Sequence, residues 1–302
     1  MDTHVVPGSR FVDPKVLARI KDLELLARSV VDGLINGLHR APYFGASVDF
    51  AEHRGYVPGD DIRRVDWKLY ARTDRYFVKQ YEADTNTNFS VLLDISKSMG
   101  FSSTGVSKLE YGKFLGACLA YLSQRQRDRV GILTFDEDIV THVPPSAKHF
   151  NVLLHTLDRA TPARPGRLLA VLDKAAEHFK RRSLVALISD LYENPDDILE
   201  ALRPYRHLGN DVVVFHLLDP AEIDFPYRDP SRFMDLESGE EVPVVPEVFA
   251  DQYRKMIREH IEALTAKCSE SRIDYVQLNT SKPLDDALFH YLGQRARMMK
   301  VR

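Results

Sequence analysis

The chain has 302 residues, of which 44% are hydrophobic and 28% charged, and its formal net charge at pH 7 is -3. This composition is typical of a water-soluble globular protein and excludes a general nucleic-acid-binding surface, which needs an excess of basic residues. No apolar stretch approaches the roughly 20 residues that cross a bilayer, and the first residues lack a secretory signal pattern. The two cysteines, Cys118 and Cys268, have no paired spacing. We therefore expect reduced thiols in a cytoplasmic protein without membrane insertion.

The first predicted element is an amphipathic helix that begins at Asp13–Pro14, where aspartate can cap the helix and proline is tolerated in its first turn. Apolar residues recur at helical spacing from Val16 to Leu38, and Pro42 favours an end soon afterwards. We interpret this helix as core packing for an N-terminal region. A partner-binding helix is the alternative.

A segment rich in both acidic and basic residues, 53–84, surrounds the only tryptophan of the chain. Mixed charge of this kind is ordinarily a solvated face with weak salt bridges. Its density around one aromatic residue also suits a partly buried hydrogen-bonded network, and we predict that such a network clamps the segment onto the following domain. The tryptophan in such a network would be buried, and its loss would lower stability. A recognition surface for a partner is the alternative. The residues of this clamp or partner-binding surface are Asp60, Asp61, Arg63, Asp66, Trp67 and Arg72.

From residue 88 onward, short apolar runs alternate with helical patterns. This predicts an α/β fold with a doubly wound, mostly parallel sheet and helices on both faces. Segment 220–245 breaks the alternation, and its Ser-Gly turn between two extended pieces predicts an inserted β-hairpin. We therefore expect a small helix and strand region, 1–87, packed on a main domain, 88–302. The expected strands are 89–94, 129–135, 184–189, 211–217 and 273–278, with an extended piece at 138–143; the expected helices are 107–124, 147–158, 167–181, 195–207, 246–268 and 284–297.

Polar side chains follow two of the expected strands. Asp94, Ser96 and Ser98 come at the end of the first strand, and Asp190 ends the strand at 184–189. Because ligands of open α/β sheets bind at the carboxyl ends of the strands, these residues can converge on one site. Oxygen ligands of this kind suit Mg²⁺ or another hard divalent cation. The D-x-S-x-S spacing resembles the metal-ion-dependent adhesion site of von Willebrand factor A-like domains, in which the cation keeps a position open for a partner's carboxylate.

The resemblance to adhesion sites fails in the second loop, where such sites normally offer a threonine. The corresponding stretch, 163–172, has Arg167 directly after Gly166. An arginine removes a hydroxyl ligand and brings a permanent positive charge, which could itself neutralise Asp94 or Asp190. Thr161 is an alternative source of the hydroxyl. Two versions of the site therefore stay open, one that holds a divalent cation and one that is stapled by Arg167.

A second motif precedes the strand at 89–94. It reads G-Y-x-P-G-D-D-x-R-x-x-D-W-x-x-x-A-R-T over residues 55–73. Together with D-x-S-x-S, it resembles the bacterial domain-of-unknown-function-58 family over about residues 40–300. The resemblance implies a von Willebrand A-like fold and a MoxR-type AAA+ ATPase and/or a client protein as partner, in maturation or remodelling of proteins. Longer members carry transmembrane segments ahead of this region, so the chain resembles the short soluble form.

Enzyme motifs are missing from the sequence. It has no phosphate-binding G-x-x-x-x-G-K-[ST] loop, no nucleophile-elbow serine and no H-E-x-x-H pair. The histidines His142, His149 and His155 do not have a recognised metal-ligand spacing. We therefore predict a non-enzymatic protein-binding adaptor. A metal-independent structural scaffold is the alternative, and a metal-assisted hydrolase that uses Asp94 and Asp190 is a remote one.

Overall fold

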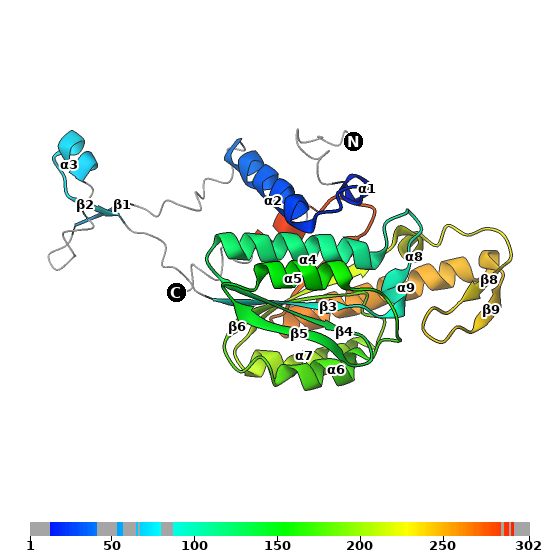
Figure 1. Ribbon diagram of the computed structural model, residues 1–302. Helices are drawn as coiled ribbons and strands as arrows, with labels where there is room; N and C mark the ends of the chain where they lie inside the picture. The colour runs from blue at the N-terminus through cyan, green and yellow to red at the C-terminus, as the bar shows by residue number, and fades with distance from the viewer. Residues whose placement is uncertain are drawn as a thin grey trace.

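The computed structural model describes residues 13–40, 53–56, 65, 67–79, 87–284, 287–289 and 291–292. Within them, a six-stranded sheet with the order β10-β7-β6-β3-β4-β5 lies between two layers of helices (Figure 1). All neighbouring strands are parallel except β4 and β5, which are antiparallel. This arrangement confirms the predicted doubly wound, mostly parallel α/β fold. The strands are β3 (Asn88–Asp94), β4 (Arg129–Phe135), β5 (Ile139–Ser146), β6 (Ser183–Ser189), β7 (Asp211–Leu218) and β10 (Asp274–Asn279).

The central strands are almost wholly apolar because helices cover both of their faces. Every residue of β6 is buried. The edge strand β5 runs further than the expected extended piece at 138–143. Gly131 permits this pairing, because a Cβ atom there would lie 2.7 Å from the backbone of both Val143 and Pro145, at a break in the register of β4 and β5.

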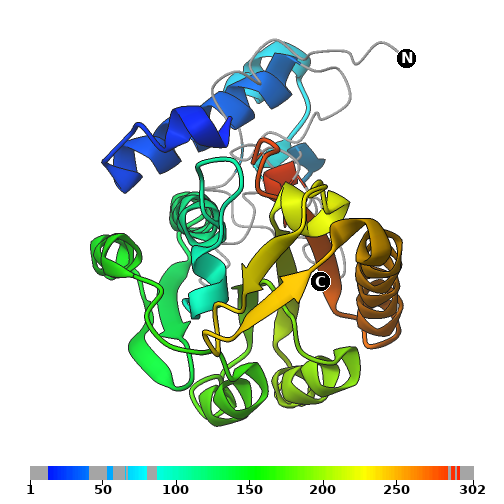
Figure 2. The same cartoon turned by 90° about the vertical axis from the view of Figure 1, so that its right-hand side faces the viewer.

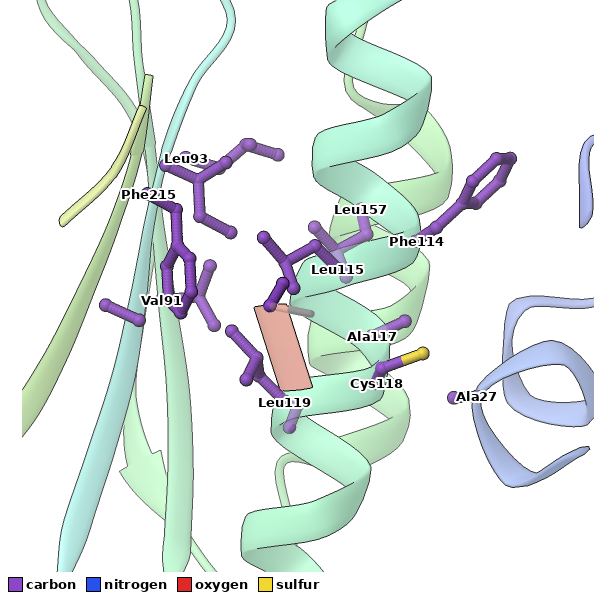
Figure 3. Close-up of a cluster of buried hydrophobic side chains, with 14 of the residues drawn as sticks. Ala27, Val91, Leu93, Phe114, Leu115, Ala117, Cys118, Leu119, Leu157 and Phe215 are labelled. Carbon is purple, nitrogen blue, oxygen red and sulfur yellow. The ribbon is translucent and has the colours of Figure 1, made fainter. Parts of the chain in front are cut away.

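On one face of the sheet, α4 (Lys108–Arg125) lies between the strands and the N-terminal helix α2 (Leu23–Arg40). Figure 3 shows Leu115 and Leu119 on the side of α4 that faces Phe215, whereas Cys118 points toward Ala27 of α2. All of these side chains are buried. The predicted amphipathic helix at the N-terminus therefore contributes to the main core.

The opposite face is covered by α6 (Leu168–Ala176), α7 (Pro195–His207) and α9 (Pro246–Glu270), which enclose a second apolar cluster. Helix α6 ends before the expected residue 181. The side chain of Asn210 joins the connection to β6, because it donates to the carbonyl oxygen of Phe179 at 3.0 Å and accepts from the N–H of Ser183 at 2.8 Å. Three further helices are α1 (Pro14–Leu17), α5 (Phe150–Arg159) and α8 (Pro220–Asp224). Most of the helix predicted at 284–297 lies outside the described residues.

Three short elements precede the sheet: β1 (His53–Gly55), α3 (Trp67–Thr73) and β2 (Phe77–Lys79). They lie apart from the six-stranded sheet in Figure 1. The side chain of Trp67 is 55% exposed and meets the ring of Tyr70 edge-on, so the expectation that Trp67 is buried is wrong. Arg72 is exposed as well. Asp60, Asp61, Arg63 and Asp66 lie outside the described residues, so the clamp and the division at residue 87 stay predictions.

The segment 220–245 contains an antiparallel hairpin of β8 (Ser231–Met234) and β9 (Glu241–Val244). Gly239 in its turn has a φ of 77°, which glycine adopts at little cost. Figure 2 looks onto the end of the sheet and shows the hairpin, in yellow to orange, lying across the front of it. The turn of the hairpin lies near the short helix η3 (Lys97–Gly100), drawn in teal. The hairpin therefore lies over the carboxyl ends of the strands.

Candidate functional site

Asp94 and Asp190 lie at the carboxyl ends of the adjacent parallel strands β3 and β6. The structure thus brings the two predicted aspartates to one edge of the sheet, and both are buried. The hydroxyl group of Ser189 donates a hydrogen bond of 2.6 Å to Oδ2 of Asp94. The strand order reverses at β3, because β4 pairs with it on one side and β6 pairs with it on the other, and such a switch point is where open α/β sheets bind ligands.

The loop after β3 arranges its two serines around the Asp94 carboxylate. The backbone N–H of Ser96 donates to Oδ1 of Asp94 at 2.8 Å. The hydroxyl oxygens of Ser96 and Ser98 are 3.1 Å apart. Two neighbouring ligands of an octahedral Mg²⁺, with bonds of about 2.1 Å, are separated by about 3.0 Å. The serine hydroxyls therefore have the spacing of two adjacent ligands of such an ion.

The Asp94 carboxyl group is held in an environment that opposes its negative charge. Burial raises its pKa to about 7, and the nearby charge of Asp190 acts in the same direction, although hydrogen bonds from Ser189 and Ser96 oppose the shift. No lysine, arginine or histidine forms an ion pair with Asp94 in the part of the chain that the structure describes. A bound cation would supply the missing positive charge.

Asp190 has a different environment, because a buried lysine neutralises it. Nζ of Lys108 lies 2.7 Å from Oδ2 of Asp190 and 2.7 Å from Oε1 of Glu222, and the lysine side chain has no exposed surface. Burial alone would lower the pKa of Lys108, but the charges of the two carboxylates raise it above its ordinary value. The ring of Tyr192 covers the ammonium group at 4.7 Å.

Arg167 was expected to neutralise Asp94 or Asp190, and the structure shows that Lys108 pairs with Asp190 instead. Arg167 is exposed, and no ion pair joins it to either aspartate within the described ranges. Its backbone N–H donates to the carbonyl oxygen of Asp136 at 3.2 Å where α6 begins. The expectation that Arg167 staples the site is therefore wrong, because Lys108 fills that role for Asp190. The alternative threonine, Thr161, is exposed.

The second loop contributes a backbone donor in place of the missing threonine hydroxyl. The N–H of Gly166 donates to Oε2 of Glu237 at 2.9 Å, and the N–H of Ser98 donates to Oε1 of the same carboxylate at 2.8 Å. Glu237 lies in the turn of the β8–β9 hairpin. The sequence analysis missed both Glu237 and Lys108. The available signals were the cluster of acidic residues in the hairpin turn and a lysine at the first position of the helix after D-x-S-x-S.

The donor set at this edge of the sheet fits a hard divalent cation. It offers carboxylate and hydroxyl oxygens from Asp94, Ser96 and Ser98, with the Glu237 carboxylate next to Ser98. No group of three His, Cys, Asp or Glu side chains is arranged to hold a metal among the residues whose positions are described. A cation here would therefore depend on the two serine hydroxyls.

Two of the three histidines without a metal-ligand spacing, His142 and His149, lie in different environments. The ring of His142 packs against that of His178, with centroids 4.2 Å apart, and burial lowers the pKa of His142. Nδ1 of His149 lies 2.7 Å from the carbonyl oxygen of Pro144.

Across the described parts of the chain, no helix is both long and apolar enough to cross a membrane.

A sequence model of the family described as "Protein of unknown function DUF58" matches residues 52–269. The uncharacterized proteins Mb1516 of Mycobacterium bovis and Rv1480 of Mycobacterium tuberculosis are each 29% identical to this chain over 235 residues, which covers 75% of this chain and 73% of each relative. Two solved structures are similar to it. The conserved hypothetical protein BatB from Bacteroides thetaiotaomicron is 18% identical to this chain, with a TM-score of 0.48. The match covers 70% of this chain and 99% of the BatB chain. An aerotolerance-related membrane protein from Bacteroides fragilis has 19% identity, 69% and 99% coverage and a TM-score of 0.46.

Proposed function

Because this chain belongs to the DUF58 family, whose description assigns no activity, we propose a function from the chemistry of its site. The protein is a non-enzymatic adaptor of the von Willebrand A-like type. It binds an acidic side chain of a partner protein through a divalent cation held by Asp94, Ser96 and Ser98. The observation that carries this proposal is the pair of serine hydroxyls 3.1 Å apart beside a buried carboxylate that has no cationic partner among the described residues.

The residues around the cation would divide the work of binding. Asp94 supplies negative charge, and its hydrogen bonds with Ser96 and Ser189 fix its orientation. The cation, when bound, supplies a Lewis-acidic position for an incoming carboxylate. The Lys108 ammonium group holds Asp190 in place beneath the loops, so that this second carboxylate does not need the cation for neutralisation.

Adaptor function, in preference to catalysis, is supported by the surroundings of the serines. A serine nucleophile needs a base within hydrogen-bonding distance. The hydroxyl groups of Ser96 and Ser98 contact each other, and no histidine hydrogen-bonds to either of them in the described structure. The carboxyl group beside Ser96 is that of Asp94, which the proposal assigns to the cation. For the partner, the sequence resemblance supports a MoxR-type AAA+ ATPase and/or its client. Two free, buried cysteines suit the reducing cytoplasm that the proposal includes.

The proposal predicts cation-dependent capture of a partner. Wild-type protein immobilised on beads is expected to retain an AAA+ ATPase from lysate of its own cells in Mg²⁺ and to lose it in EDTA. Asp94→Ala should abolish capture in both buffers while the fold is kept, because the charge that holds the cation is gone. The captured proteins are identified by mass spectrometry.

Asp138→Ala is the matched control, because Asp138 is an exposed aspartate after β4 that pairs with Lys174 and not with the site. This variant should capture as well as the wild type. Capture of the ATPase that persists in EDTA and in Asp94→Ala would contradict the cation site. The absence of any ATPase in Mg²⁺ would favour the metal-independent scaffold.

A further inference from the structure

The hairpin of β8 and β9 places a carboxylate directly on the candidate site. Each oxygen of Glu237 accepts one backbone N–H group, Oε1 from Ser98 and Oε2 from Gly166. These donors belong to two different loops, one after β3 and one before α6. We call the pair of N–H groups the carboxylate cradle. The view in Figure 2 shows how the hairpin reaches across the end of the sheet to this position.

The cradle recognises a carboxylate group and not the chain that carries it. Two N–H donors at 2.8 and 2.9 Å, one for each oxygen, form charge-assisted hydrogen bonds with any aspartate or glutamate side chain that reaches them. A Cβ atom on Gly166 would lie 3.0 Å from Cβ of Ser96. Glycine at this position therefore lets the second loop approach the serine loop closely enough for both N–H groups to meet one carboxylate.

Few other contacts hold the hairpin. The ring of Phe233 packs against Phe225 and Tyr227, with centroids 5.8 and 4.9 Å apart. Between residues 231 and 244, only Phe233, Glu237 and Val244 are partly buried, and the other side chains are exposed. Segments with little buried apolar surface open locally at a small cost in free energy. Apart from its anchor at Phe233, the hairpin thus depends on Glu237 for its contact with the site.

The electrostatics of the site also favour an exchangeable contact. Glu193 does not neutralise the negative charge of Glu237, because it is itself a carboxyl group. Burial and the charges of Asp190 and Glu237 raise the pKa of Glu193. Glu237 makes no ion pair within the described portion of the chain. The carboxylate of Glu237 is therefore held by the cradle, and the neighbouring carboxylate of Glu193 repels it.

We propose that Glu237 is a built-in competitor that fills the carboxylate cradle in the free protein and is displaced by an aspartate or glutamate side chain of a partner protein. The inference rests on the proposed function for its external ligand. It adds that the cradle N–H groups of Ser98 and Gly166 select a carboxylate, and that the hairpin must leave before a partner binds. The hairpin then swings out on its Phe233 end.

The test supplies the competitor from outside the chain. A fluorescein-labelled, head-to-tail cyclised peptide with the sequence of residues 231–244 is titrated with wild-type protein, Glu237→Gln and Glu240→Gln, and fluorescence anisotropy is measured. Glu240 is the matched control, because it lies in the same turn and is exposed. We expect the Glu237→Gln protein to bind the peptide about 10-fold more tightly than the other two, as follows if the hairpin is docked in about nine of ten wild-type molecules.

A second peptide, with glutamine in place of the glutamate at position 237, should not bind to any of the three proteins. Equal affinity of all three proteins for the first peptide, no binding at all, or equal binding of both peptides would overturn the proposal. Each titration is repeated in Mg²⁺ and in EDTA. If the preference for Glu237→Gln persists unchanged in EDTA, the competitor role stands and the cation of the proposed function fails.

Discussion

Lys108→Ala is expected to lower the free energy of unfolding by about 3–5 kcal/mol at pH 7, because removal of one partner from a buried ion pair leaves uncompensated charge in the interior. Lys108 is the buried cation between Asp190 and Glu222, and both distances are 2.7 Å. Its loss would leave two carboxylates facing each other near Asp94, whose own charge is already opposed by burial. Urea denaturation followed by circular dichroism measures the change.

Two further variants separate this ion-pair effect from a general effect of losing a lysine. Lys174→Ala removes an exposed lysine that pairs with Asp138 and should leave the urea midpoint unchanged within error. The triple variant Lys108→Met, Asp190→Asn and Glu222→Gln removes all three charges together and should recover most of the lost stability. If Lys108→Ala unfolds at the same urea concentration as Lys174→Ala, the buried pair does not stabilise the floor of the site.

The double variant Ser96→Ala and Ser98→Ala is expected to weaken the binding of Mn²⁺, used as a substitute for Mg²⁺, by about 100-fold or more. Changes in residues that only orient metal ligands weaken metal binding by about 10- to 100-fold, and these hydroxyls are proposed as ligands themselves. Their separation of 3.1 Å matches adjacent corners of an octahedron. Electron paramagnetic resonance of free Mn²⁺ gives the affinity.

Ser107→Ala is the control for the serine variant. Ser107 caps α4 through a reciprocal pair of bonds with Glu110, and its hydroxyl group contacts Glu110 and no residue proposed as a cation ligand. Its replacement should lower the free energy of unfolding by about 1 kcal/mol and leave Mn²⁺ affinity unchanged. Equal Mn²⁺ affinity in the wild type and in the double serine variant would show that these hydroxyls do not hold the ion.

The sequence predicts the sheet well, because strands that are covered on both faces must be apolar and end where polar residues begin. The run before Asp94 and the run before Asp190 both show this pattern, and the structure places them as neighbouring strands β3 and β6. The convergence of Asp94, Ser96 and Asp190 at one edge follows from the parallel direction of these strands. Local pattern and strand direction are sufficient for this part of the site.

The contacts that shape the site from a distance could not be predicted in this way. Periodicity places Lys108 at the start of α4 but does not reveal that it points inward to Asp190, which is 82 positions away. Glu237 reaches Ser98 across 139 positions, and only the path of the hairpin brings them together. Trp67 shows the opposite error, because a single aromatic among charges is also compatible with an exposed position.

The most direct test of the cation site is the nuclear magnetic resonance spectrum of the ¹⁵N-labelled protein during titration with Mn²⁺ below one equivalent. A paramagnetic ion broadens the signals of amide groups close to it. The account predicts early loss of the Ser96, Ser98 and Gly166 signals. Gly209 precedes β7 at the amino-terminal ends of the strands, opposite to the candidate site, and its signal should keep its intensity. Broadening that spares the three site amides, or that affects Gly209 to the same extent, would contradict a cation held by Asp94, Ser96 and Ser98.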